Sequence, residues 1–106
     1  MLVKMETGAS GGGGVQLPLN QEFVVGVPAQ NIGRRFFTFT TGIKTMQAKA
    51  IAGHSTYLYT TASGGTAFQT ITGATYQNVD VSNYDVIYAD STSTRIDTTF
   101  KFIDYV

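Results

Sequence analysis

The stretch TRIDTTFKFIDYV, residues 94–106, carries the alternation that decides the fold class. Ile96, Thr98, Phe100 and Phe102 occupy every second position, and polar or charged residues lie between them. Successive side chains of a strand point to opposite sides of a sheet, so this period of two predicts a strand with one buried face. The β-branched and aromatic residues favour the same assignment.

Similar short runs, rich in aromatic residues and threonine, recur along the chain between breaks that contain Gly, Ser or Asn. They occupy residues 34–41, 55–61, 66–72, 75–81 and 85–90, and residues 15–27 predict one or two strands more. The segment TMQAKAIA, residues 45–52, has helix-forming alanines, but its length and its β flanks favour a strand. We therefore predict an all-β protein, an antiparallel β-sandwich or jelly-roll-like domain of about seven to nine short strands.

The beginning of the chain has a different character, because SGGGGV at residues 10–15 precedes the first apolar run. A phosphate-binding P-loop requires a lysine and a hydroxyl residue after its last glycine, whereas Val15 and Gln16 follow here. Glycine lets a backbone lie close to another chain, in a groove or along a strand edge. We expect an extended arm at residues 1–14 and a β domain at residues 15–106. The arm residues expected to contact a partner are Gly11, Gly12, Gly13 and Gly14.

Composition narrows the classes of function. The chain has 106 residues, no cysteine, zero formal net charge and only 13% charged residues, against about 25% in typical domains. No basic field marks a nucleic-acid binder, and no apolar run approaches the ~20 residues that cross a membrane. A surface poor in charge suits a protein that packs against neighbours, so we expect protein partners and neither nucleic acid nor membrane.

Candidates for catalysis or metal binding are few. His54 lies in a predicted turn, AGHST, without a second histidine or a cysteine to complete a metal site. Asp80, Asp85 and Asp90 are spaced by five residues and fall where turn aspartates commonly occur. A weak calcium site on these aspartates, or a hydrolase with His54 close to two of them, stays open as an alternative. We predict no enzyme, no cofactor and no metal.

Tyrosines are the most informative side chains of this sequence. Tyr57 and Tyr59 flank Leu58, so both should face outward if Leu58 faces the core. Exposed aromatic pairs on a sheet commonly form a contact surface. We expect Tyr57 and Tyr59 to contact a protein partner, with core packing or stacking on a glycan as the alternatives.

Strands rich in threonine, glycine and aromatic residues follow the glycine-rich arm, as in FFTFTTG (36–42) and STYLYTTASGGTAFQTITGATYQNVDVS (55–82). The chain resembles the small β-rich accessory proteins of tailed-phage virions, namely capsid decoration (cement) proteins and small tail or fibre components. The resemblance implies a structural protein of the virion, made in the host cytoplasm, that binds and stabilises an assembled particle.

The same resemblance implies a homo-oligomer, most often a trimer, whose arm reaches an adjacent major capsid or tail subunit. The alternative is a small tail or fibre component with a carbohydrate-binding β-sandwich. Aromatic residues in a concave groove would favour the glycan, and a flat self-complementary patch would favour the protein partner.

Overall fold

The structure is a computed structural model that describes residues 2–5, 18–39, 42–84, 86–92 and 94–106. Every regular element in these ranges is a strand, so the all-β prediction is confirmed; of the segment 45–52 that was assigned to a strand, residues 45–49 belong to one and residues 50–52 follow its end. No helix of the described part is long and apolar enough to cross a membrane. The strands are β1 (Leu2–Met5), β2 (Phe23–Val27), β3 (Arg35–Phe39), β4 (Ile43–Lys49), β5 (Ser55–Tyr59), β6 (Gln69–Thr72), β7 (Gln77–Asp80), β8 (Val86–Ser91) and β9 (Ile96–Tyr105).

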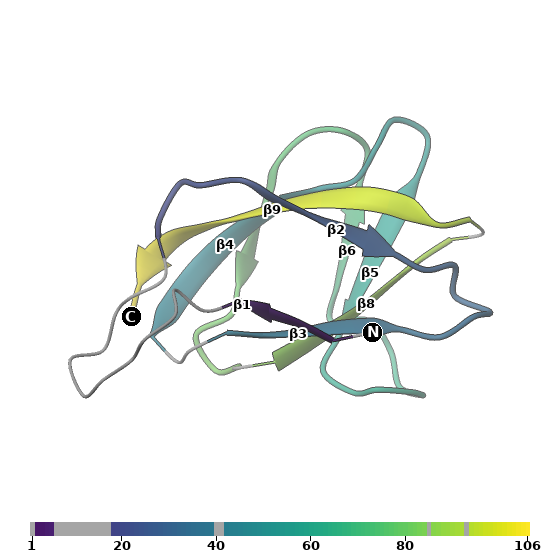
Figure 1. Ribbon diagram of the computed structural model, residues 1–106, viewed down its shortest axis with the longest axis horizontal. Coiled ribbons are helices and arrows are strands. Elements are labelled where there is room, and N and C mark those ends of the chain that lie inside the picture. Colours follow the sequence, from purple (N-terminus) through teal and green to yellow (C-terminus); the bar gives the residue numbers. More distant parts are fainter. Residues whose placement is uncertain (1, 6–17, 40–41, 85, 93) are drawn as a thin grey trace.

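These strands form two sheets. The five-stranded sheet has the order β1-β3-β8-β5-β6, and the four-stranded sheet has the order β2-β9-β4-β7. Figure 1 shows β2 and β9 above β3 and β8 in this view, and buried side chains of both sheets meet in one core. The described part is therefore a two-layered, sandwich-like arrangement of strands.

Pairing between β2 and β9 begins a nested series. β2 pairs with β9, β3 with β8, β4 with β7 and β5 with β6, and each pair is antiparallel. The first four of these strands thus pair with the last four in reverse order, as in one long hairpin folded over on itself. Two further antiparallel pairs complete the sheets. β4 with β9 joins the pairs β2–β9 and β4–β7 in one sheet, and β5 with β8 joins the pairs β3–β8 and β5–β6 in the other.

The core lies between the sheets. On β9 the predicted apolar face is confirmed, because Ile96, Thr98, Phe100 and Phe102 are each at most 3% exposed. Burial of these large side chains supplies the main free-energy gain that holds the layers together. Both sheets contribute fully buried residues, among them Val25, Met46 and Val79 from one sheet and Leu58, Ile71 and Ile87 from the other.

One polar contact crosses this core. The hydroxyl oxygens of Thr56 on β5 and Thr98 on β9 lie 2.7 Å apart, and both residues are fully buried. Each hydroxyl can donate to or accept from the other, so neither is left unsatisfied away from water. This hydrogen bond links the two sheets at a fixed register.

The beginning of the chain contributes β1 to the five-stranded sheet. β1 pairs in parallel with β3 at the sheet edge, with Leu2 opposite Phe36 and Met5 opposite Phe39. Part of the predicted arm, residues 2–5, is therefore a strand of the sheet. Residues 6–17, which include the predicted contacts Gly11, Gly12, Gly13 and Gly14, lie outside the described residues.

Candidate binding site

The tyrosines selected from the sequence lie on β5, on either side of Leu58. Leu58 is fully buried in the core, so Tyr57 and Tyr59 belong to the outer face of the five-stranded sheet. Tyr57 is half-buried and lines an open hollow. Tyr59 lies on the predicted face of the strand, but it is only 8% exposed and is therefore not the exposed aromatic that the sequence indicated.

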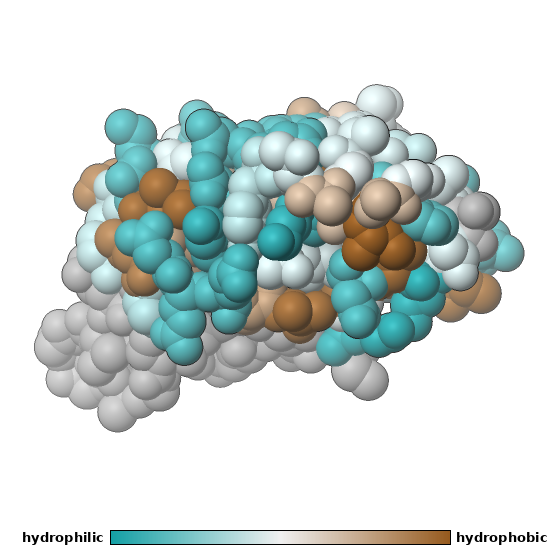
Figure 2. Space-filling view, turned by 90° about the horizontal axis from the view of Figure 1, so that it is seen from above, coloured by the Kyte–Doolittle hydropathy of each residue, from teal (hydrophilic) through white to brown (hydrophobic). Residues whose placement is uncertain are grey.

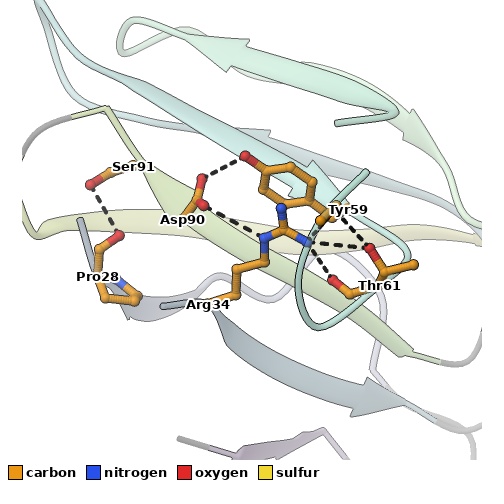
Figure 3. A network of polar contacts seen from close by, with 7 residues as sticks. Pro28, Arg34, Tyr59, Thr61, Asp90 and Ser91 are labelled. Carbon is orange, nitrogen blue, oxygen red and sulfur yellow. Dashed lines mark hydrogen bonds and ion pairs between the residues drawn. The ribbon is translucent and has the colours of Figure 1, made fainter. Parts of the chain in front are cut away.

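Arg34 explains the burial of Tyr59. The guanidinium carbon of Arg34 lies 3.4 Å from the centre of the Tyr59 ring and covers its face. The Tyr59 hydroxyl donates a hydrogen bond of 3.0 Å to Oδ1 of Asp90 on the neighbouring strand β8. Figure 3 shows the guanidinium of Arg34 over the Tyr59 ring, with both side chains joined to Asp90 by dashed lines. Tyr59 is thus enclosed in an internal polar network.

The guanidinium of Arg34 also fixes the loop that follows β5. Its Nε lies 3.6 Å from Oδ2 of Asp90, and one terminal nitrogen donates to the carbonyl oxygens of Thr61 and Gly64 at 2.8 and 3.0 Å. A guanidinium offers several donors in a rigid plane, so a single side chain can hold all three acceptors, of which Figure 3 labels Asp90 and Thr61. The loop is therefore attached to the sheet through Arg34.

Burial shifts the pKa values of the two acidic groups in this network, the Asp90 carboxyl and the Tyr59 hydroxyl. It raises the pKa of the Asp90 carboxyl, while the hydrogen bond from Tyr59 and the charge of Arg34 act in the opposite direction. Burial also raises the pKa of the Tyr59 hydroxyl, and the hydrogen bond to Asp90 adds to this effect. Asp90, which the sequence placed at a turn, lies within β8 with both its oxygens engaged. These groups hold structure together and do not serve as a free acid or base.

Beside the network lies a hollow of about 350 Å³. Two of its residues, Tyr57 and Thr70, are directly opposite each other on the neighbouring strands β5 and β6. The loop held by Arg34 supplies a second side of the hollow, and Gln30 from the segment after β2 supplies a third. Its lining consists of Gln30, Tyr57, Tyr59, Gly65, Thr66, Ala67 and Thr70.

Backbone bonds to Ser91 hold the Gln30 side of the hollow in place. The backbone N–H of Ser91 donates to the Pro28 carbonyl at 2.8 Å, and the N–H of Gln30 donates to the Ser91 carbonyl at 2.9 Å. The Ser91 hydroxyl also lies 3.2 Å from the Pro28 carbonyl oxygen, as Figure 3 shows. The end of β8 thus fixes Gln30, as Arg34 fixes the opposite loop.

Several polar side chains of the hollow are available to a ligand. Among the residues that the structure describes, none makes a hydrogen bond to the side chains of Gln30, Tyr57, Thr66 or Thr70. An amide and three hydroxyls offer both donors and acceptors. A hollow lined by aromatic side chains and a few convergent polar groups has the composition of a small-molecule binding site.

A second polar cluster surrounds Tyr76, whose hydroxyl donates a hydrogen bond to Glu22. The side-chain nitrogens of Lys49 and Lys101 lie 4.7 and 4.4 Å from the centre of the Tyr76 ring. Burial raises the pKa of Tyr76 to about 12, and the hydrogen bond to Glu22 adds to the rise. The carboxylate of Glu22 offsets one of the two lysines, so the cluster carries a single net positive charge.

The described part of the molecular surface, seen from above the view of Figure 1, is mainly hydrophilic or neutral. Its hydrophobic residues form small separate patches and no continuous band (Figure 2). The exposed large hydrophobic residues of the described part are correspondingly dispersed: Val24, Ile32, Ile51 and Val106. Single exposed apolar side chains of this kind do not by themselves define an interface.

Other sequence candidates have structural roles or fall outside the description. Asp80 accepts hydrogen bonds from the backbone and hydroxyl of Ser82 at 3.0 and 2.7 Å, which lower the pKa of its carboxyl and stabilise a turn. The backbone N–H of His54 donates to the Ile51 carbonyl at 3.0 Å. Asp85 lies outside the described residues. In the described ranges, no group of three or more His, Cys, Asp and Glu residues could hold a metal ion.

Sequence reasoning missed the role of Arg34. The arginine and Asp90 lie far apart in the chain and meet because the antiparallel register of β3 and β8 places Arg35 opposite Ala89. A local signal existed, because an acidic residue interrupts the apolar pattern of VIYAD at Asp90. A buried carboxylate requires a partner, although its identity depends on the fold.

Comparisons with protein-family models, curated proteins and solved structures found no match for the chain.

Proposed function

We propose that this protein is a structural component of a virus particle. It binds an assembled phage shell or tail through protein–protein contacts and stabilises it, as a capsid decoration protein does. It acts as a homo-oligomer, with a trimer favoured, and its mechanism is binding without a chemical reaction.

The nested strand pairing is the observation that carries this proposal. We propose that β2 to β9 form a jelly roll, an arrangement of eight strands in two sheets that recurs in viral capsid domains. The pairs β2–β9, β3–β8, β4–β7 and β5–β6 match a folded ribbon of this kind. Jelly rolls also form lectins and cupins, so the topology supports a binding or structural role more than any particular reaction.

The edge of the five-stranded sheet supports an assembly role for the N-terminal segment. β1 adds to β3 through main-chain hydrogen bonds, which do not depend on side-chain identity. We propose that the glycine-rich residues after β1 extend this segment towards a neighbouring subunit. In a particle, neighbouring subunits would also cover sheet edges that otherwise promote aggregation.

Mass spectrometry of purified particles from the encoding virus tests the proposal. We expect the protein in washed particles at a copy number that matches the particle symmetry. Its absence from the particles, despite its presence in the lysate of infected cells, would overturn the proposal.

Light scattering of the purified full chain gives an independent measurement of its mass. We expect a trimer or another closed oligomer. A strict monomer at every concentration would contradict the oligomeric part of the proposal.

A further inference from the structure

We propose that the hollow at Tyr57 binds one or two rings of a neutral sugar, as found at the end of an uncharged glycan. This inference does not depend on a virion role, because it concerns the surface of the isolated domain. It follows from the size, the chemistry, the charge and the rigidity of the hollow.

The size of the hollow suits a small ligand. At about 350 Å³ it lies near the lower end of the range for small-molecule sites. It lies over strands β5 and β6, so regular sheet forms its base and only its sides come from loops. A hollow of this size can hold one or two sugar rings but not a folded peptide segment.

The chemistry of the lining matches a sugar ring. A pyranose has C–H bonds on one face and hydroxyls around its edge, so it binds best to an aromatic face bordered by donors and acceptors. Tyr57 supplies the aromatic ring, and Gln30, Thr66 and Thr70 supply an amide and two hydroxyls. None of these three side chains has a hydrogen-bond partner within the described part of the chain.

Charge selects neutral over acidic sugars. Each of the seven residues that line the hollow is uncharged. Asp90 is buried and Arg34 is half-buried, and the guanidinium of Arg34 is already engaged by Asp90 at 3.6 Å and by the carbonyl oxygens of Thr61 and Gly64. A sialic acid carboxylate would therefore lose its water without gaining a cationic partner.

The hollow is held in shape before a ligand arrives. Arg34 bonds to the Thr61 and Gly64 carbonyls and fixes the loop that contributes Gly65 and Thr66. Bonds between Ser91 and the Pro28–Gln30 segment fix the other side. A site that is already ordered loses little conformational entropy when a ligand binds.

Titration of the full-length, isotope-labelled chain by NMR tests the inference. The probes are the methyl glycosides of glucose, galactose, mannose and N-acetylglucosamine, followed by lactose and sialyllactose. We expect at least one neutral sugar to shift the resonances of Gln30, Tyr57 and Thr70, with a dissociation constant on the order of millimolar. Sialyllactose should bind no better than lactose.

Variants give the control for this experiment. Tyr57→Ala should weaken binding by about ten-fold or more, because truncation of a central aromatic contact removes most of its binding energy, whereas Tyr57→Phe should retain the stacking. Gln30→Ala alters an exposed side chain, so it should weaken binding without disturbing the fold. Tyr76→Ala, a tyrosine outside the lining of the hollow, should leave binding unchanged.

Three outcomes would overturn the inference. They are the absence of shifts with all the neutral sugars, shifts that persist unchanged in Tyr57→Ala and Gln30→Ala, and stronger binding of the sialylated sugar. Presence or absence of the protein in virus particles affects none of them, so the two proposals can fail separately.

Discussion

Arg34 determines the local structure around the candidate site. Its guanidinium covers the Tyr59 ring, pairs with Asp90 and holds the carbonyls of Thr61 and Gly64. Sequence patterning placed Tyr57 and Tyr59 on the same face but could not show which of them another residue would cover. Alternation along a strand specifies the face, whereas burial depends on residues that arrive from elsewhere in the fold.

Removal of the Arg34 side chain should destabilise the folded protein. Arg34→Ala leaves the Asp90 carboxylate buried without a cationic partner, and we expect a loss of about 3–5 kcal/mol in the free energy of unfolding. Arg95→Ala is a matched control, because Arg95 pairs with Asp97 at 3.5 Å in an exposed position. That variant should lose about 0–1 kcal/mol. Urea unfolding measures both values, and equal losses would show that Arg34 does not stabilise the fold through burial.

The buried threonine pair should behave as a unit. Thr56→Val leaves the Thr98 hydroxyl without its partner, and we expect a loss of about 1–3 kcal/mol in the free energy of unfolding. Thr98→Val should cost a similar amount. The double variant should lose less than the two single variants together, because both hydroxyls are then absent. Simple additivity in a double-mutant cycle would contradict a direct hydrogen bond between them.

Tyr76 should make stability depend on pH in the alkaline range. Its pKa of about 12 in the folded protein exceeds the value near 10 of an unfolded tyrosine. The folded state therefore retains the proton more strongly, so this contribution to stability is present below about pH 10 and is lost as the pH rises towards 12. Absorbance of the phenolate should show an ionisation step near pH 12 in the folded protein.

Variants identify that step. Tyr76→Phe should abolish it, and Glu22→Gln should move it to lower pH, because the carboxylate that accepts the Tyr76 hydrogen bond is then uncharged. Tyr57→Phe should leave the step in place. Persistence of the step in Tyr76→Phe would assign it to another tyrosine.

Individual strands differ in how clearly the sequence predicted them. β9 has a long alternation of apolar and polar residues, and its buried face was predicted residue by residue. Residues 15–27 suggested one or two strands, but only Phe23–Val27 are a strand in the described part. β1 was not predicted, because LVKM is too short for a pattern and the partner of an edge strand is set by the sheet.

Deletion of residues 1–17 tests the role of β1. The nested pairs β2–β9 to β5–β6 do not include it, so we expect a folded domain by circular dichroism with a lower unfolding midpoint. The exposed edge of β3 should promote association at high concentration. Successive N–H groups of a strand point to opposite sides, so one of the two single variants Val3→Pro and Lys4→Pro removes a donor that faces β3, and that variant should reproduce the stability loss. An unfolded truncated chain would show that these residues are essential to the fold.

At the scale of the whole molecule, composition and strand rhythm predicted the fold class but not the strand order. The first and last strands of the nested series meet, with Phe23 opposite Phe100 and Val27 opposite Ile96. Nothing in the local sequence specifies such distant partners. The order is set by which apolar faces cover one another once all strands are present.

Folding should therefore be slow for a chain of this length. Pairing of distant strands requires loop closure before the contacts that compensate for it form, and such β proteins fold in about milliseconds to seconds. Stopped-flow fluorescence of tyrosine after dilution from urea measures this rate. Double-jump experiments separate any slower phase at Pro18 or Pro28. A folding time in microseconds would contradict the nested pairing.

The position of β9 inside its sheet has a consequence for synthesis on the ribosome. β9 lies between β2 and β4 and pairs with both, so β2 has no partner in the four-stranded sheet until residues 96–105 have been translated. At about 5–20 residues per second, β2 waits on the order of ten seconds for its partner. During that time the apolar faces of the earlier strands have only each other or a chaperone as cover. The nascent chain should accordingly remain sensitive to proteases until its ninth strand emerges.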